Sequence, residues 1–163
     1  MFQVPEVKFS GCEGVSRPIL ANALEWVQSR LEADGMVPRC DVSGPNLAPF
    51  IRHASLFELI IENGLVQDYH ARVLASHIAD NIQEISGRTG KETLPAELFE
   101  RWRVTAQHLI DTGHPFSTRS QVYGKENKNA ESLIVPVSEN GRLTHALVFT
   151  EYWFDQPRFS YEI

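Results

Sequence analysis

The clearest hydrophobic pattern of the chain lies near its C-terminus. Residues 133–138 and 143–150 each divide into two alternating sets of side chains, which is the period of a β-strand. The pair Asn140-Gly141 stands between them and favours the left-handed backbone angles of a two-residue turn. The pattern predicts an antiparallel hairpin, in which His145 is the polar residue on an otherwise apolar face.

Three earlier segments are rich in the residues that strands prefer. Asn63-Gly64 separates the first two, which are therefore predicted to form a second antiparallel pair. Pro136, inside the closing hairpin, lacks a backbone donor and predicts an edge position, a bulge or a break in pairing. The three segments are residues 55–62, 69–74 and 116–124.

Helical spacing of apolar residues marks two longer segments and a short one. Ser16 is the predicted N-cap of the first helix, and Pro18 falls in its first turn, where a missing N–H does no harm. Gly113 follows the last helix, and glycine is a common helix stop. The predicted helices cover residues 17–34, 76–86 and 95–112.

The elements thus run helix, connector, two strands, helices and three strands. This order indicates an α+β fold, with a five-stranded antiparallel sheet, helices on one face and an extra N-terminal helix. The proline-rich connector 37–50 is expected to lie against the fold. We predict three parts, namely an arm with its flanking helix (1–35), one domain (36–154) and a tail (155–163).

Composition argues against several classes of partner. The formal charge of −6 disfavours nucleic acid and anionic membranes, which attract an excess of Lys and Arg. No apolar run approaches the roughly 20 residues that span a bilayer, and the N-terminus lacks a signal-peptide core, so we expect a cytoplasmic protein. Cys12 and Cys40 are the only cysteines and are predicted to be free thiols, while a redox role for them stays open.

Several short elements follow one another in a recognisable order along residues 36–153. They are Pro38-Arg39-Cys40-Asp41 with Pro45, Leu47 and Pro49, then Tyr69, Arg72, Ala75 and Ser76, then Gly87 and Gly90, then Val135-Pro136-Val137-Ser138 before Asn140-Gly141. In this order they resemble the PAS superfamily, and within it a bacterial branch with a proline-rich segment before the first strand. Two features depart from that branch, because Ala75 replaces a glycine and the connection from Gly87 to Gly90 is short.

The resemblance implies a non-enzymatic sensory or regulatory module whose ligand varies across the superfamily. PAS-like proteins often pair through a flanking helix, so residues 17–34 are the candidate homodimer element. Signalling would then pass through a separate output protein.

Six side chains are candidates for binding a small ligand. Arg72 would need a carboxylate or an anionic ligand if it faced inward, and His108 could ligate haem iron. Each also has an ordinary interpretation as core, surface ion pair or solvated helix residue. The candidates are Tyr69, Arg72, His77, Phe99, Trp102 and His108. No metal site is predicted, and the cofactor stays open, with haem or flavin considered.

Two alternatives belong to other functional classes. A small cone-shaped α+β enzyme would use His145 with Glu58 or Glu151 as an acid–base pair, which requires those side chains to lie close together in a deep pocket. An interaction protein with a filled core would instead show a large exposed apolar patch. No nucleophile elbow, zinc-binding helix or phosphate loop supports catalysis.

Overall fold

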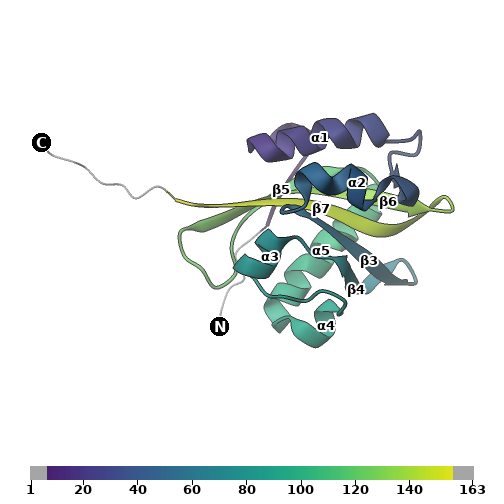
Figure 1. Ribbon diagram of the computed structural model, residues 1–163. Coiled ribbons are helices and arrows are strands. Elements are labelled where there is room, and N and C mark those ends of the chain that lie inside the picture. The colour runs from purple at the N-terminus through teal and green to yellow at the C-terminus, as the bar shows by residue number, and fades with distance from the viewer. Residues whose placement is uncertain (1–6, 156–163) are drawn as a thin grey trace, which may run out of the picture.

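The computed structural model of the chain describes residues 7–155 and has an α+β architecture with one seven-stranded sheet (Figure 1). The strand order is β1-β5-β6-β7-β3-β4, and β2 pairs with β6 beside this path. The strands are β1 (Lys8–Ser10), β2 (Val37–Pro38), β3 (Ala54–Glu62), β4 (Leu65–Val73), β5 (Phe116–Gln121), β6 (Lys128–Glu139) and β7 (Arg142–Phe154). The helices are α1 (Pro18–Arg30), α2 (Gly44–Leu47), α3 (Ser76–Asn81), α4 (Gly90–Thr93) and α5 (Ala96–Thr112), with 3₁₀ turns η1 (Cys12–Gly14), η2 (Arg39–Asp41) and η3 (Ala48–Phe50).

The predicted α+β class is confirmed, whereas the predicted count of five strands is wrong. Strands β3 to β7 are the five expected, and every neighbouring pair among them is antiparallel. The extra strands β1 and β2 have three and two residues, so neither is long enough to produce a readable alternation. β2 pairs in parallel with Val137 and Ser138 of β6, whereas β1 adds an antiparallel edge beside β5.

Both predicted turns have the expected backbone. Asn63 and Gly64 have φ values of 53° and 76°, and Asn140 and Gly141 have 53° and 77°. The positive values at both turn positions match a tight hairpin whose twist suits the strands it joins. Pro136 lies between two pairing partners, because β5 pairs with β6 up to residue 134 and β2 pairs with it from residue 137.

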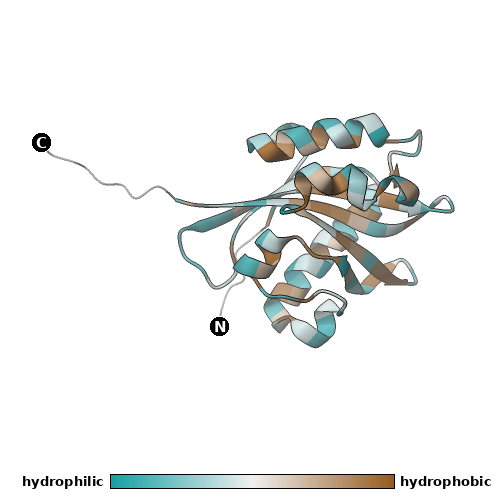
Figure 2. Cartoon of the chain, viewed as in Figure 1, coloured by the Kyte–Doolittle hydropathy of each residue, from teal (hydrophilic) through white to brown (hydrophobic). Residues whose placement is uncertain are grey.

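Helix α1 packs on one face of the sheet and buries its apolar stripe there. Leu20, Ala23 and Val27 have no exposed surface and contact the core formed with β6, β7 and the η3 segment. Figure 2 shows the apolar positions of α1 turned toward the sheet. The stripe that suggested a dimer element is therefore already covered by the same chain.

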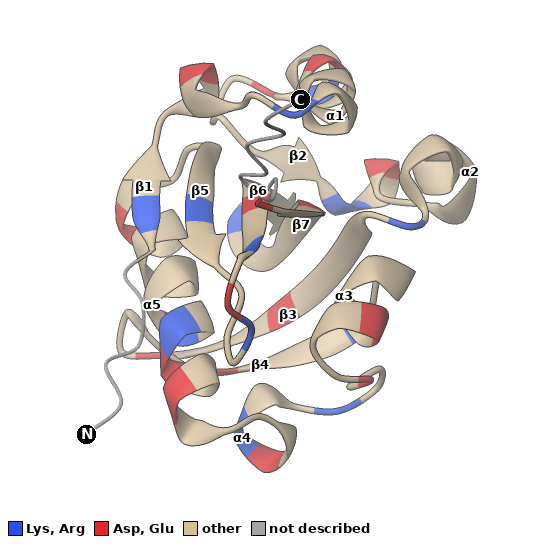
Figure 3. Cartoon of the chain, turned by 90° about the vertical axis from the view of Figure 1, so that its left-hand side faces the viewer, with Lys and Arg blue, Asp and Glu red and all other residues tan. Residues whose placement is uncertain are grey.

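Helices α3, α4 and α5 cover the opposite face, as the turned view in Figure 3 shows. The second core lies here, where Leu98 and Leu109 of α5 meet Phe57 of β3 and Ile134 of β6. The proline-rich connector does lie against the fold, because Leu47 and Phe50 are buried in the first core. Helices therefore cover both faces, with α1 and α2 on one side and α3 to α5 on the other, and the prediction of helices on one face is wrong.

A buried carboxylate on β6 holds the start of α1. Glu131 is 1% exposed, and its carboxylate accepts hydrogen bonds from the backbone N–H groups of Ser16 and Arg17 at 3.1 and 2.9 Å. The helix has Arg17 at the N-cap with no hydrogen bond from its own side chain, so the predicted cap at Ser16 is wrong. Glu131 instead binds the two N–H groups that precede the helix from a distant strand, and its charge suits the positive end of the helix dipole.

Within residues 7–155, no helix is long and apolar enough to cross a membrane.

Candidate ligand cavity

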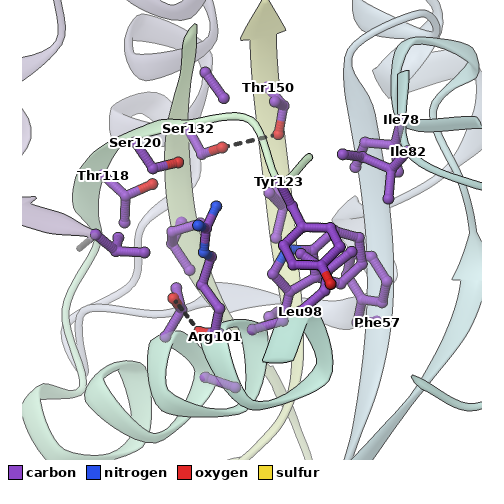
Figure 4. Close-up of a pocket in the computed structure, with 18 of the residues that line it drawn as sticks. Phe57, Ile78, Ile82, Leu98, Arg101, Thr118, Ser120, Tyr123, Ser132 and Thr150 are labelled. Atoms are coloured by element: carbon purple, nitrogen blue, oxygen red, sulfur yellow. Dashed lines mark hydrogen bonds between the residues drawn. The ribbon is translucent and has the colours of Figure 1, made fainter. Parts of the chain in front are cut away.

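A cavity lies between the sheet and α5, on the face away from α1. Its volume is about 110 Å³, which is room for several water molecules or one small ligand. Side chains from β3 to β7 form its floor, and α5 and α3 form its walls (Figure 4).

One end of the cavity is aromatic. The rings of Phe57 and Trp102 lie edge to face with centroids 5.9 Å apart, and Tyr69 lies 5.9 Å from Phe57 in the same arrangement. Leu98 of α5 and Ile82 add aliphatic surface beside these rings. This end offers dispersion contacts and edge-to-face geometry to a flat or aliphatic ligand group.

The other end carries a row of hydroxyl groups. Thr118 and Ser120 come from β5, Ser132 from β6 and Thr150 from β7. Figure 4 shows these side chains side by side above α5, and the hydroxyls of Ser132 and Thr150 are 2.9 Å apart. Hydroxyl groups both donate and accept hydrogen bonds, so the row can bind several kinds of polar ligand atom.

Arg101 rises from α5 toward this row (Figure 4). The residue is 9% exposed, and its Nη1 donates to the backbone carbonyl of Gln121 at 2.9 Å. Burial lowers the pKa of the guanidinium from its ordinary value, and the neighbouring Tyr123 acts in the opposite direction. An arginine stays protonated at neutral pH despite such a shift, so Arg101 is a charged group at the polar end of the cavity.

Three of the six candidate residues lie at or beside the cavity. Tyr69 and Trp102 line it, and Phe99 stacks on Tyr69 with ring centroids 5.4 Å apart. The hydroxyl of Tyr69 donates to the backbone carbonyl of Phe99 at 3.1 Å. Burial raises the pKa of Tyr69, and the nearby Asp68 and Glu100 raise it further, so the phenol is neutral and acts as a donor here.

The other three candidates lie elsewhere in the fold. Arg72 forms a 3.0 Å ion pair with Glu58 on the surface of the sheet, where both side chains are close to half exposed. His108 stacks on Phe9 at 4.4 Å and meets Phe116 edge to face, so it does not line the cavity that a haem would enter. His77 lies against His53 at the start of α3, outside the cavity.

The acid–base pair of the enzyme alternative lies on the other face of the sheet. His145 Nε2 is 3.8 Å from Glu58 Oε2, so the two groups are neighbours. Burial lowers the pKa of His145, and the positive charge of Arg39 lowers it further. Glu151, the other trial partner, lies 3.2 Å from His53 instead. None of these groups lines the cavity between the sheet and α5.

Sequence reasoning overlooked the hydroxyl row and Arg101. A usable signal existed, because small and hydroxyl residues recur on the same face of three strands: Thr118 and Ser120, Ala130 and Ser132, Ala146 and Thr150. Residues this small on the buried face of a sheet leave space between sheet and helix. From the sequence alone, Arg101 is expected off the apolar face of this helix, because a charged side chain on an amphipathic helix is usually solvated.

Gly90, one of the residues on which the resemblance rests, packs closely against Tyr69. A Cβ atom at this position would overlap the ring of Tyr69, so α4 can approach the cavity wall only with a glycine there. The glycine thus fixes the position of one cavity residue through close packing.

Comparison of the chain with protein-family models, with curated proteins and with solved structures finds no match.

Proposed function

We propose that this chain is a non-enzymatic sensory or regulatory module, PAS-like in fold, that binds a small ligand in the cavity between the sheet and α5. The observation that carries the proposal is the cavity itself, about 110 Å³ in volume and lined by side chains of the strands and helices that the resemblance implies. Strands β3 and β4, then helices, then strands β5 to β7 follow one another as in a PAS domain. The interaction-protein alternative requires a filled core, and a cavity of this size argues against it.

The lining favours a compact ligand with two unlike ends. Phe57 and Trp102 suit an apolar or aromatic body, whereas Arg101 and the hydroxyls of Ser120 and Thr118 suit an anionic or hydrogen-bond-accepting group. We therefore propose a small organic acid, or a similar molecule with one acceptor group, as the class of ligand.

The first experiment identifies what the protein holds when it is purified. Native mass spectrometry and an absorption spectrum of the protein from its own host would show a bound metabolite by mass and a haem or flavin by colour. If nothing copurifies, benzoate and benzyl alcohol serve as matched probes in ¹H–¹⁵N NMR titrations. We expect shifts confined to cavity residues and tighter binding of benzoate, because only benzoate carries the charge that Arg101 would bind.

A filled cavity provides the decisive control. Ala146→Leu places a larger side chain inside the cavity, whereas Ala21→Leu makes the same change at an exposed position on α1. We expect the first variant to lose ligand binding and the second to keep it, with both folded by circular dichroism. Equal binding by the two variants would remove the cavity as the ligand site.

Homodimer formation and signalling through a separate cytoplasmic protein complete the proposal. Because Leu20, Ala23 and Val27 are packed on the sheet, a dimer through α1 would have to use the outer surface of the helix. Light scattering of the intact chain tests this point, and a monomer mass at high protein concentration would exclude the dimer.

A further inference from the structure

A second cluster of chemically capable side chains lies outside the cavity. His53 comes from the turn before β3, His77 from the first turn of α3, and Glu151 from the C-terminal half of β7. One possible ligand atom of each residue lies within 4.8 Å of the other two. All three side chains are partly buried, unlike the acidic groups that gather by chance on an exposed surface.

The spacing of the three groups is close to that of a metal site. His53 Nδ1 is 3.2 Å from Glu151 Oε2, and the rings of His53 and His77 have centroids 4.3 Å apart with an interplanar angle of 73°. Ligand atoms at about 2.1 Å from a tetrahedral zinc ion stand about 3.4 Å apart. The distance between His53 and Glu151 is thus already close to the separation that zinc requires. Rotations of the partly exposed side chains can shorten the distances from these two groups to His77.

The backbone holds the three segments together without help from the cluster. The N–H of His77 donates to the carbonyl of Arg52 at 3.1 Å, and the N–H of Thr150 donates to the carbonyl of His53 at 3.0 Å. The first bond joins the start of α3 to the turn before β3, and the second joins that turn to β7. The ligand positions are therefore preorganised, which reduces the entropy lost when an ion binds.

One ring nitrogen gives an independent indication of a missing ligand. Nδ1 of His77 is buried and has no hydrogen-bond partner among residues 7–155. Buried polar atoms are nearly always satisfied, and an exception calls for an unobserved water or ion.

We propose that His53, His77 and Glu151 bind one divalent first-row transition-metal ion, for which Zn²⁺ is the best match. Two imidazoles and one carboxylate form a common three-ligand set for zinc, and a water molecule would occupy the fourth position. The hard ions Mg²⁺ and Ca²⁺ prefer all-oxygen sites and should not bind here. Metal binding would replace the contacts that Nδ1 of His53 makes with Glu151 and, at 3.1 Å, with the backbone carbonyl of Thr150, because that nitrogen must offer a lone pair instead of an N–H group.

The site would join two parts of the cavity wall. Ile78 follows His77 on α3, and Thr150 and Tyr152 flank Glu151 on β7, and all three of these neighbours line the cavity. A metal ion bound to His77 and Glu151 would thus fix α3 against β7. The metal site itself does not depend on whether the cavity binds a ligand.

Isothermal titration calorimetry of tag-free, chelator-treated protein with Zn²⁺ tests the proposal. We expect one ion per chain, no binding of Mg²⁺, and a rise in the melting temperature with Zn²⁺ concentration. His77→Ala and Glu151→Gln should each weaken Zn²⁺ binding by at least about 10-fold, because each removes a direct ligand. His114→Ala is the matched control, since it removes an exposed histidine outside the cluster.

Cobalt provides a readout that reports geometry as well as affinity. Co²⁺ bound by two imidazoles and a carboxylate should give the intense visible bands of a four- or five-coordinate ion, and His77→Ala should abolish them. Circular dichroism melts of the metal-free variants check that each is folded, and Glu151→Gln preserves the side-chain shape should an alanine variant fail. Absence of stoichiometric Zn²⁺ binding, or equal affinity in Glu151→Gln and His114→Ala, would overturn the proposal.

Discussion

The carboxylate of Glu131 should account for a large share of the attachment of α1 to the sheet. The change to test is Glu131→Gln, which keeps the shape of the side chain but removes its charge. In the folded chain this carboxylate accepts from the N–H groups of Ser16 and Arg17, from Ser16 Oγ at 2.7 Å and from Arg119 Nη2 at 2.7 Å. A glutamine presents an NH₂ group on one side, where it meets donors instead of acceptors.

The magnitude follows from the bonds that are lost. A hydrogen bond to a charged group contributes about 1.5–3 kcal/mol, and a buried N–H left without an acceptor costs about 1–3 kcal/mol. The contribution of Arg119 is smaller, because 51% of its side chain is exposed and water can replace the carboxylate. Glu131→Gln should therefore lower the free energy of unfolding by about 2–4 kcal/mol, a large fraction of the usual stability of a domain.

Urea denaturation followed by circular dichroism measures this change, and Glu139→Gln is the matched control. Glu139 lies on the same strand but is exposed, so its loss should change the free energy of unfolding by less than about 0.5 kcal/mol. Hydrogen exchange supplies a local readout. The amides of Ser16 and Arg17 should lose protection in Glu131→Gln before those of the central strands do.

The effect should also depend on pH with a defined sign. Burial alone would raise the pKa of Glu131, but the hydrogen bonds from Arg119, Ser16 and Arg17 outweigh it and hold the pKa below its ordinary value. The stabilisation is then complete above the unfolded-state pKa, about 4.3, and is lost as the pH falls toward the lower pKa of the folded state. The gap between the wild type and Glu131→Gln should narrow in that acidic range.

Two results would refute this reasoning. A destabilisation no larger than that of Glu139→Gln would mean that the buried carboxylate contributes nothing beyond a surface glutamate. A gap that stays constant from neutral pH to below pH 4 would mean that the charge of Glu131 is not the source of the effect.

Two glycines give sharper tests of packing and of backbone strain. Gly90→Ala should destabilise the fold by about 1–3 kcal/mol, because the new Cβ overlaps the ring of Tyr69 and the core must shift. Gly44→Ala is its control in the same urea denaturation, since a Cβ added at Gly44 would have no atom within 4 Å apart from its chain neighbours. Equal effects of the two variants would contradict the packing argument. Gly141→Ala should lower stability by about 1–2 kcal/mol, because the residue has a φ of 77° in open space and strain is the only cost. An unchanged melting temperature for Gly141→Ala would show that the turn relaxes to another type.

Local signals made the strands and helices of the central domain predictable. The turns at Asn63-Gly64 and Asn140-Gly141 need left-handed backbone at both positions, and few other residue pairs supply it cheaply. The amphipathic spacing of α5 similarly follows from its own residues, with Leu98 and Leu109 on the buried side. A short strand within residues 1–15 was one of two possibilities, but the partners of β1 and β2 could not be predicted, because both strands pair only where β5 and β6 offer an open edge.

The candidate site was harder to predict than the fold. Tyr69 and Trp102 were found because large aromatic residues mark the core, and the cavity is a loosely filled part of that core. Arg72 and His108 have the chemistry of ligand-binding residues, but the structure gives them a surface ion pair and an aromatic stack. Side-chain type indicates what a residue can bind, whereas only its direction in the fold decides what it meets.

By itself the sequence determined the closing hairpin, the order of the elements and the α+β class, because turn residues and alternation act over a few neighbouring positions. Tertiary structure alone decided that Glu131 would hold the start of α1 from a distant strand, and that His53, His77 and Glu151 would meet. Those contacts join segments far apart in the chain. Their distances follow from how the sheet and helices pack, and no local pattern of residues encodes them.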